Sequence, residues 1–156
     1  MAATSPTQRT LKAMKDLGRV SGIVERFNQF AGPYGIRQDL FGFIDIICMC
    51  PKEVTRAIRV SKFHDVLPGE VRHGGIVAVQ SFGQDWSGHV KKLHEERADD
   101  MKMWLQCGGR LELWGWRKLK AIKKDGTKGA AMRWQPRIGD VKLSESGEIE
   151  VIERKR

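Results

Sequence analysis

The sequence lacks any apolar run of the roughly 18 residues that a membrane-spanning helix needs, so we expect no membrane partner. Cysteine is scarce, since only Cys48, Cys50 and Cys107 occur, and no signal peptide precedes them. An odd number of cysteines without a signal peptide is typical of free thiols in a reducing compartment. The sequence therefore predicts a cytoplasmic protein.

Several catalytic signatures are also absent. No glycine fingerprint follows a predicted strand, and strands and helices do not alternate regularly, which excludes a Rossmann domain. No phosphate-binding loop, nucleophile elbow or Ser-His-Asp order occurs, so the sequence gives no support to the enzyme classes built on those motifs.

Acidic residues are too few to balance the basic ones. The 156 residues include 28 lysines and arginines against 19 aspartates and glutamates, which gives a formal charge of +9 and a pI near 9.7. A single domain this basic predicts a polyanionic partner, usually nucleic acid. The alternative is that the charge serves solubility alone.

The first half of the chain predicts one helix and three strands. A helix is predicted over residues 5–17, because Ser5 can cap it and Leu11, Met14 and Leu17 follow at helical spacing. Strands are predicted at residues 20–27, 40–50 and 74–82. A turn-rich loop separates the first two strands, and an irregular basic insertion at residues 51–74 separates the last two.

The second half predicts another helix and further strands. The helix begins at residue 85 and ends at Gly108. Strands are predicted at residues 110–119 and 130–134, followed by a hairpin at residues 140–153. The order helix, strand, strand, strand, helix, strand predicts an α/β fold with a mixed central sheet. We expect one domain over residues 1–156, with a core at about 7–120 and a C-terminal β extension at about 128–153.

An acidic residue interrupts the most apolar stretch of the sequence. Residues 40–50 are typical of a strand buried on both faces, yet Asp45 lies in the middle. An ionised carboxylate buried without a partner costs several kcal/mol, or its pKa rises. Asp45 therefore needs a partner. One alternative is a structural ion pair with an arginine such as Arg37.

Other oxygen donors can meet Asp45 at the end of this strand. If the second and third strands pair as a hairpin, Gln80 on the third strand lies in the same pocket. Glu25 on the first strand and Asp39 on the loop entering the second are further candidates. Carboxylate and amide oxygens suit a hard cation. We therefore expect Mg²⁺, or Mn²⁺, at Asp45, Gln80 and Asp39, with Glu25 as an additional site residue.

The element order, the segment "GFIDII" and the segment "IVAVQ" resemble the restriction-endonuclease-like, or PD-(D/E)xK, nuclease superfamily. Small phage and archaeal Holliday-junction-resolvase-like members are the nearest in kind, and the resemblance covers residues 7 to 120. It implies a cytoplasmic, Mg²⁺-dependent DNA endonuclease of bacterial, archaeal or phage origin. By this pattern Asp45 and Gln80 bind the metal.

The chain departs from that pattern at the catalytic lysine. The superfamily places a lysine two residues after the Glu or Gln, where it orients the attacking water, but this chain has Phe82 there. Some members carry the lysine on the following helix instead. Lys91 and Lys92 on the predicted second helix are the candidates, and the helical wheel slightly favours Lys91 because it flanks the apolar stripe.

Two groups of basic residues are expected to bind phosphates without reading sequence. The residues in question are Lys52, Arg56, Arg59, Lys62, Arg117, Lys118 and Lys120. The expected substrate is DNA, including branched DNA. Two alternatives stay open: a catalytically degenerate nuclease fold that serves as a DNA-binding module, and an RNA-processing nuclease.

A homodimer is expected because resolvase-like members cut two strands with two active sites. Two sets of apolar residues are candidates for the interface. One is the face of the predicted terminal hairpin, formed by Val141, Leu143, Ile149 and Val151. The other is the pair Trp114 and Trp116. The alternative is that these residues only complete the core of one chain.

Overall fold

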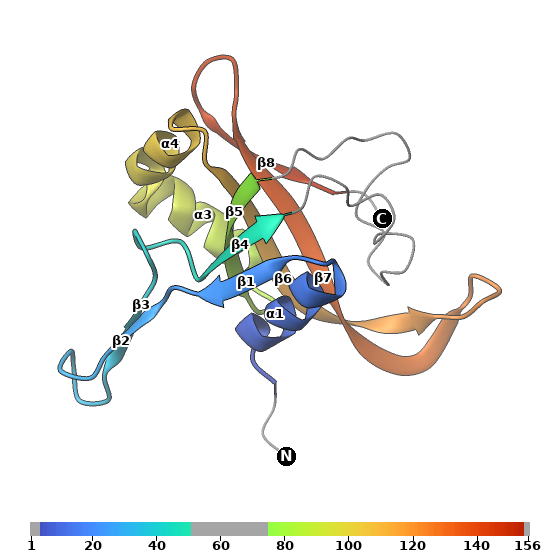
Figure 1. Cartoon of the computed structure of the whole chain (residues 1–156). Coiled ribbons are helices and arrows are strands. Elements are labelled where there is room, and N and C mark those ends of the chain that lie inside the picture. The colour runs from blue at the N-terminus through green and yellow to red at the C-terminus, as the bar shows by residue number, and fades with distance from the viewer. Residues whose placement is uncertain (1–3, 51–74, 155–156) are drawn as a thin grey trace.

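The computed structural model describes residues 4–50 and 75–154. The described residues form a six-stranded mixed sheet, a two-stranded hairpin and three helices (Figure 1). The elements are α1 (Pro6–Asp16), β1 (Val20–Ile23), β2 (Arg26–Asn28), β3 (Ile36–Gln38), β4 (Ile46–Cys50), β5 (Gly75–Phe82), α3 (Trp86–Glu96), α4 (Ala98–Gln106), β6 (Arg110–Ile122), β7 (Lys128–Leu143) and β8 (Ile149–Glu153). The predicted α/β class with a mixed sheet is confirmed. No helix among these residues is long and apolar enough to cross a membrane.

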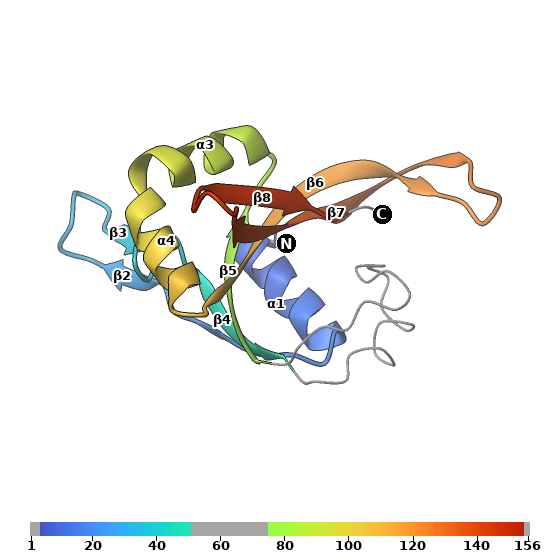
Figure 2. The ribbon, with the colours of Figure 1, turned by 90° about the horizontal axis from the view of Figure 1, so that it is seen from above.

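The sheet has the strand order β1-β4-β5-β6-β7-β8. Only β5 and β6 are parallel, and α3 and α4 form the crossover between them. All other neighbours pair antiparallel. Figure 2 shows α1 on one side of the sheet and the α3–α4 pair on the other. Each helical layer therefore covers its own core.

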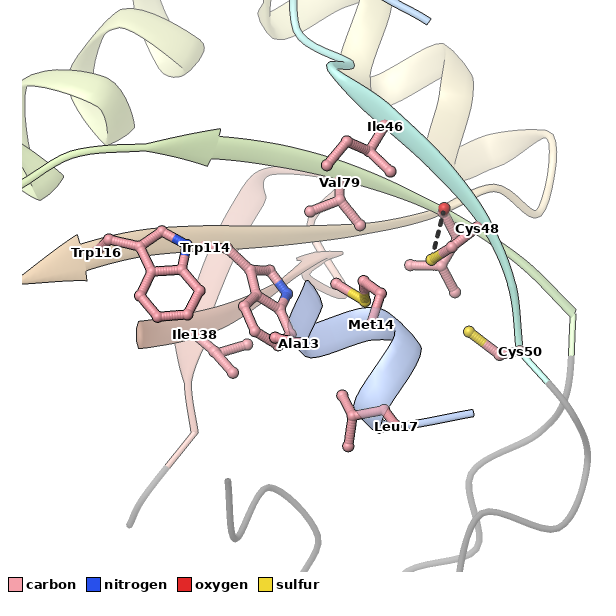
Figure 3. Close-up of a cluster of buried hydrophobic side chains, with 11 residues drawn as sticks. Ala13, Met14, Leu17, Ile46, Cys48, Cys50, Val79, Trp114, Trp116 and Ile138 are labelled. Carbon is pink, nitrogen blue, oxygen red and sulfur yellow. Dashed lines mark hydrogen bonds between the residues drawn. The ribbon is translucent and has the colours of Figure 1, made fainter. Parts of the chain in front are cut away.

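The α1 side of the sheet is a closely packed apolar core (Figure 3). Ala13, Met14 and Leu17 of α1 pack against β4, β5 and the buried indoles of Trp114 and Trp116. The predicted helix start is confirmed, because the hydroxyl of the N-cap residue Ser5 accepts a hydrogen bond from the N–H of Gln8. The two tryptophans belong to the core of one chain, so they offer no dimer surface.

The opposite core lies under α3 and α4. Leu93 and Met101 are buried there against Ala78, Leu111 and Leu113 of the sheet. Val141 and Ile149 are buried in the same core, and Leu143 and Val151 pack against it. The hairpin face therefore completes the core of one chain rather than offering a separate apolar surface.

The single helix expected from residue 85 onward is wrong, because the structure has two helices divided at Arg97. Arg97 has φ −131° and ψ 15°, outside helical geometry. Asp99 and Asp100 follow in the first turn of α4, where acidic side chains favour a helix N-terminus. Gly108 ends α4 at a positive φ of 82°, as expected.

The strand expected over residues 40–50 begins only at Ile46. Phe41 and Gly42 have φ 55° and 77°, and Leu40 and Ile44 form an isolated bridge around them. The expectation of one continuous strand over residues 40–50 is therefore wrong. The chain turns before it enters the sheet because left-handed backbone at two consecutive residues is incompatible with an extended strand.

The strand expected over residues 20–27 is also divided. β1 ends at Ile23, and β2 then pairs with β3 in a separate hairpin, Arg26↔Gln38 through Asn28↔Ile36. Glu25 lies between the two strands rather than within one. The segment expected to be only a turn-rich loop thus supplies β3.

The strands expected at residues 130–134 and in the first arm of the terminal hairpin are one long strand, β7. It pairs with β6 from Val141 down to Lys128 and with β8 from Leu143 to Gly139. β6 likewise continues past its last β5 pair at Gly115. The far parts of β6 and β7 therefore leave the sheet as a twisted two-stranded ribbon (Figure 1, Figure 2).

One buried ionic network ties the segment after β8 to the centre of the sheet. The carboxylate of Glu112, 1% exposed, accepts hydrogen bonds from Arg19 at 2.8 and 3.1 Å and from Arg154 at 2.7 Å. Arg154 also donates to Asp140 at 2.6 and 2.8 Å. The guanidinium groups hold the pKa of Glu112 far below its usual range despite its complete burial.

Candidate functional site

Asp45 and Gln80 stand opposite each other where β4 begins and β5 ends. The last pair of the ladder at this end is Ile46↔Val79, so the next position on each strand brings Asp45 and Gln80 together. The N–H of Asp45 donates to the carbonyl of Val79 at 3.0 Å. The N–H of Ser81 donates to Oδ2 of Asp45 at 2.6 Å. The backbone of β5 therefore fixes the carboxylate of Asp45, which is only 7% exposed.

Three carboxylates converge at this end of the sheet. One oxygen from each of Glu25, Asp39 and Asp45 lies within 4.8 Å of the others. Glu25 follows β1 and Asp39 follows β3, so the β2–β3 hairpin brings both beside Asp45. The structure thus brings together the three acidic residues that the sequence nominated. All three oxygens can act as ligands for one ion.

The surroundings of Asp45 disfavour its charged form. Burial raises the pKa of Asp45 to about 8, and the negative charges of Asp39 and Glu25 act in the same direction. The hydrogen bond from the Ser81 N–H acts in the opposite direction but does not compensate. The carboxylate of Asp45 therefore needs either a proton or a cation at neutral pH.

Arg37 does not provide that cation. Its guanidinium donates to Glu25 at 3.1 Å, and its side chain is 69% exposed. The alternative in which Asp45 forms a structural pair with Arg37 is therefore wrong. An exposed arginine on the outer acid leaves the buried acid uncompensated.

Gln80 carries an unused acceptor beside this cluster. The side chain is 7% exposed, and Oε1 has no hydrogen-bond partner among the described residues. Gln80 alternates with Val79 and Ser81, so it faces the α3–α4 side of the sheet, as Ala78 and Phe82 do. A buried amide oxygen without a partner costs about 1–3 kcal/mol. That cost makes Gln80 a credible fourth ligand.

Lys91 and Lys92 pair with other residues of α3 rather than with the acidic cluster. Their ammonium groups pair along α3 with Glu95 at 3.8 Å and Glu96 at 3.9 Å. Both side chains are largely exposed, at 72% and 60%. Neither lysine forms an ion pair with Glu25, Asp39 or Asp45. The structure therefore does not bring the candidate lysines into the site.

His89 is the residue that the sequence interpretation missed. Its imidazole stacks on the ring of Phe82, and its Nδ1 is buried without a hydrogen-bond partner among the described residues. Burial lowers the pKa of His89, and the positive charge of Lys92 acts in the same direction. The negative charges of Asp85 and Asp39 act in the opposite direction. The signal was available in the sequence, because His89 lies four residues before the buried Leu93 and so shares its helix face.

The predicted phosphate-binding residues fall into two groups. Lys52, Arg56, Arg59 and Lys62 lie outside the described residues. Arg117, Lys118 and Lys120 lie where β6 leaves the sheet, just beyond Gly115, its last partner on β5. Phe82, which pairs with Gly115, is the last residue of β5, two residues after Gln80. This second basic group therefore begins at the same end of the sheet as the acidic cluster.

Comparison with known proteins adds no relative from which a role could be transferred. The residues where β4 begins and β5 ends are therefore interpreted from their own chemistry. No family model, no curated protein and no solved structure matches this chain.

Proposed function

We propose that the chain is a metal-dependent endonuclease that hydrolyses phosphodiester bonds in DNA. The observation that supports this proposal most is the convergence of Glu25, Asp39 and Asp45 around a buried carboxylate whose pKa is raised to about 8. A site that holds like charges together is suited to a cation. The positive charge of the whole chain, +9, favours a polyanionic substrate.

The donors present fit a hard divalent cation. Glu25, Asp39 and Asp45 offer carboxylate oxygens, and Gln80 offers an unpartnered amide oxygen. Oxygen-only donor sets suit Mg²⁺ and Mn²⁺. In a phosphodiesterase such an ion supplies Lewis acidity to the phosphate and lowers the pKa of a bound water.

Each protein group has its own task in this proposal. Asp45 is held by the Ser81 N–H, so its second oxygen keeps a fixed direction. Glu25 and Asp39 come from the flanks of the β2–β3 hairpin and complete the acidic side. Gln80 contributes a neutral oxygen, which limits the negative charge that the site gathers.

The order of elements supports a restriction-endonuclease-like core. Apart from the β2–β3 hairpin and α4, the described elements run α1, β1, β4, β5, α3, β6. This is the order on which the resemblance to the PD-(D/E)xK superfamily rests. Within that proposal the DNA substrate includes branched forms such as a four-way junction, and two chains act on it together.

The position of the catalytic lysine differs from the superfamily pattern. The usual lysine position is occupied by Phe82, which is 4% exposed and packed in the core. A lysine ammonium could not reach the site from that position. Lys91 or Lys92 would have to leave its ion pair on α3 and turn toward the phosphate. The same observation favours a second candidate function, a degenerate nuclease fold that binds DNA without cutting it.

Cleavage assays on three DNA substrates separate these functions. Supercoiled, linear and four-way-junction DNA, and a structured RNA for comparison, are incubated with the wild-type chain, with and without Mg²⁺ or Mn²⁺. We expect metal-dependent cleavage that Asp45→Asn abolishes and the exposed control Asp16→Asn preserves. Metal-independent or Asp45-independent cleavage contradicts the proposed site. DNA binding without any cleavage supports the degenerate fold, and cleavage confined to RNA supports an RNA-processing enzyme.

A further inference from the structure

The ribbon formed by residues 117–135, here called the β arm, stands clear of the rest of the sheet. Its ladder runs from Arg117↔Gln135 through Lys120↔Met132 to Ile122↔Lys128. Among the described strands, β5 contributes its last pair to β6 at Gly115 and β8 its last pair to β7 at Gly139. Figure 1 and Figure 2 both show it projecting from the body of the molecule.

The tip of the β arm is well ordered by its own turn. The N–H of Lys123 donates to the carbonyl of Thr127 at 2.8 Å, and Gly126 adopts a φ of 80°. Asp125 accepts hydrogen bonds from both the N–H and the hydroxyl of Thr127. The β arm is therefore a β-hairpin whose turn is stabilised by its own hydrogen bonds.

The β arm is strongly basic. It contains seven lysines and arginines and one acidic residue, Asp125, whose carboxylate is already engaged in the turn. None of the seven forms an ion pair with another described residue. A two-stranded ribbon is marginally stable by itself, and seven uncompensated cations repel one another along it. A polyanion lying against the arm relieves that repulsion.

One face of the β arm combines the charge with exposed flat surface. The register places Lys118 opposite Trp134 and Lys120 opposite Met132, so the four share a face. This face continues the one on which Trp114 and Trp116 pack against α1. Trp134 is 37% exposed and Met132 is 55% exposed.

Helix α1 adds a further cation to this face. The guanidinium carbon of Arg9 lies 3.9 Å from the centroid of the Trp134 ring, and Lys118 Nζ lies 5.3 Å from it. Each contact is a cation–π interaction. Neither cation has a carboxylate partner among the described residues. Trp134 therefore positions two positive charges side by side at the base of the arm.

We propose that the β arm, together with Arg9, is a docking arm for duplex DNA, held through Lys118, Lys120 and Trp134. This inference rests on the proposed function in taking DNA as the polyanion, and it adds the surface that holds the substrate. A two-stranded ribbon fits the major groove of a duplex, which is about 12 Å wide. The six residues from Arg117 to Ile122 extend about 20 Å.

The position of the β arm relates it to the acidic cluster. β5 and β6 run parallel, so the end of β5 that follows Gln80 and the start of the arm lie at one end of the sheet. The two surfaces lie on opposite faces there, because Gln80 faces α3 and α4, whereas Lys118, Lys120 and Trp134 continue the face that packs against α1. The arm therefore holds the duplex at the same end of the sheet as the cluster but contributes no contact to the cluster.

Binding without metal tests the β arm separately from catalysis. Fluorescence anisotropy of a labelled duplex of about 30 base pairs is measured in EDTA across a salt series. We expect Lys118→Ala/Lys120→Ala to weaken binding about tenfold or more and to reduce the salt slope by about two. Lys15→Ala/Lys142→Ala removes the same charge at the opposite end of the sheet, and we expect less than a threefold change.

Two further variants test the same surface. Trp134→Leu keeps the charge and removes the ring, and we expect it to weaken binding by at least threefold. Lys123→Ala/Lys124→Ala changes only exposed residues near the tip, so it tests the arm even if the base variant fails to fold. Equal losses in arm and control variants overturn the proposal. A loss confined to single strands or to RNA also overturns it.

The outcomes distinguish this proposal from the nuclease proposal. Duplex binding that depends on the arm, in a chain that cleaves nothing with Mg²⁺, supports the docking arm and defeats the nuclease. Cleavage that depends on Asp45 but is unchanged in rate and affinity by the arm variants supports the nuclease and defeats the docking arm.

Discussion

The imidazole of His89 lies flat on the phenyl ring of Phe82, with ring centroids 4.2 Å apart and planes 10° from parallel. Phe82 occupies the position where the resemblance expects a lysine. The structure fills that position with an aromatic pair that joins β5 to α3. Phe82 therefore packs at the interface between β5 and α3, and a lysine at residue 82 would disrupt this packing.

Removing the imidazole should weaken this interface. We expect His89→Ala to lower the free energy of unfolding by about 1 kcal/mol, because the stacked pair is lost. His94→Ala, on the exposed side of the same helix, should change it by less than about 0.5 kcal/mol. Urea denaturation at pH 7.5 measures both. Equal effects in the two variants contradict a special role for the stack.

The same residue predicts a loss of stability in acid. Folding lowers the pKa of His89, so the unfolded chain takes up the proton first as the pH falls below about 6.5. The free energy of unfolding of the wild type relative to that of His89→Phe should therefore fall between pH 7.5 and pH 5.5. Identical pH dependence in the two chains contradicts the prediction.

Asp45 predicts a pH dependence of the opposite sign. Folding raises its pKa from 3.8 to about 8, so the folded chain keeps a proton that the unfolded chain has lost within this window. Without metal, the free energy of unfolding falls with rising pH by up to about 1.4 kcal/mol per pH unit for this group. We expect Asp45→Asn to be more stable than the wild type at pH 8 and to lose that advantage near pH 4.

Divalent metal should reverse this difference. Mn²⁺ binds the carboxylate form, so it should raise the melting temperature of the wild type more at pH 8 than at pH 6. Asp45→Asn should show little response at either pH. Calorimetric titration of both chains with Mn²⁺ measures the difference. Equal metal affinity in the variant shows that Asp45 is not a ligand.

The helix lysines make a kinetic prediction. If Lys91 or Lys92 positions the attacking water, its replacement by alanine should lower the cleavage rate about a hundredfold and leave DNA affinity within about threefold. Loss of affinity with an unchanged rate would instead identify a phosphate contact. Single-turnover cleavage and metal-free binding, measured on both variants, separate these effects.

The network around Glu112 predicts a large stability effect far from the site. Glu112→Ala leaves Arg19 buried without its carboxylate, and we expect a loss of about 3–5 kcal/mol. Glu150→Ala, an exposed residue on β8, serves as the control and should cost less than about 0.5 kcal/mol. Urea denaturation of both variants tests this expectation, and similar midpoints contradict it.

Local signals explain which parts of the fold could be predicted. Ser5 and the apolar spacing after it define α1, and the apolar run before Gln80 defines β5. Antiparallel pairing of β4 and β5 was enough to place Asp45 beside Gln80. The β2–β3 hairpin was missed because both of its three-residue strands are largely exposed and show no apolar alternation.

The length of β7 was hidden by Pro136. Proline usually ends a strand because it cannot donate to the ladder. Pro136 nevertheless lies within β7, where it pairs with Trp116 of β6. His89 was missed for a different reason: its spacing to Leu93 predicts a buried helix face, but its contact with Phe82 is tertiary and depends on how α3 packs on β5.

The Glu112 network also bears on the order in which the protein matures during synthesis. Glu112 leaves the ribosome after Arg19 but well before Arg154, so in the nascent chain this carboxylate can pair with Arg19 before Arg154 is available. The second arginine arrives after β8, and the N–H of Arg154 then donates to the carbonyl of Ile138 at 2.9 Å. Co-translational folding of this domain can therefore begin early on the α1 side, but its charge balance is complete only when residue 154 has emerged.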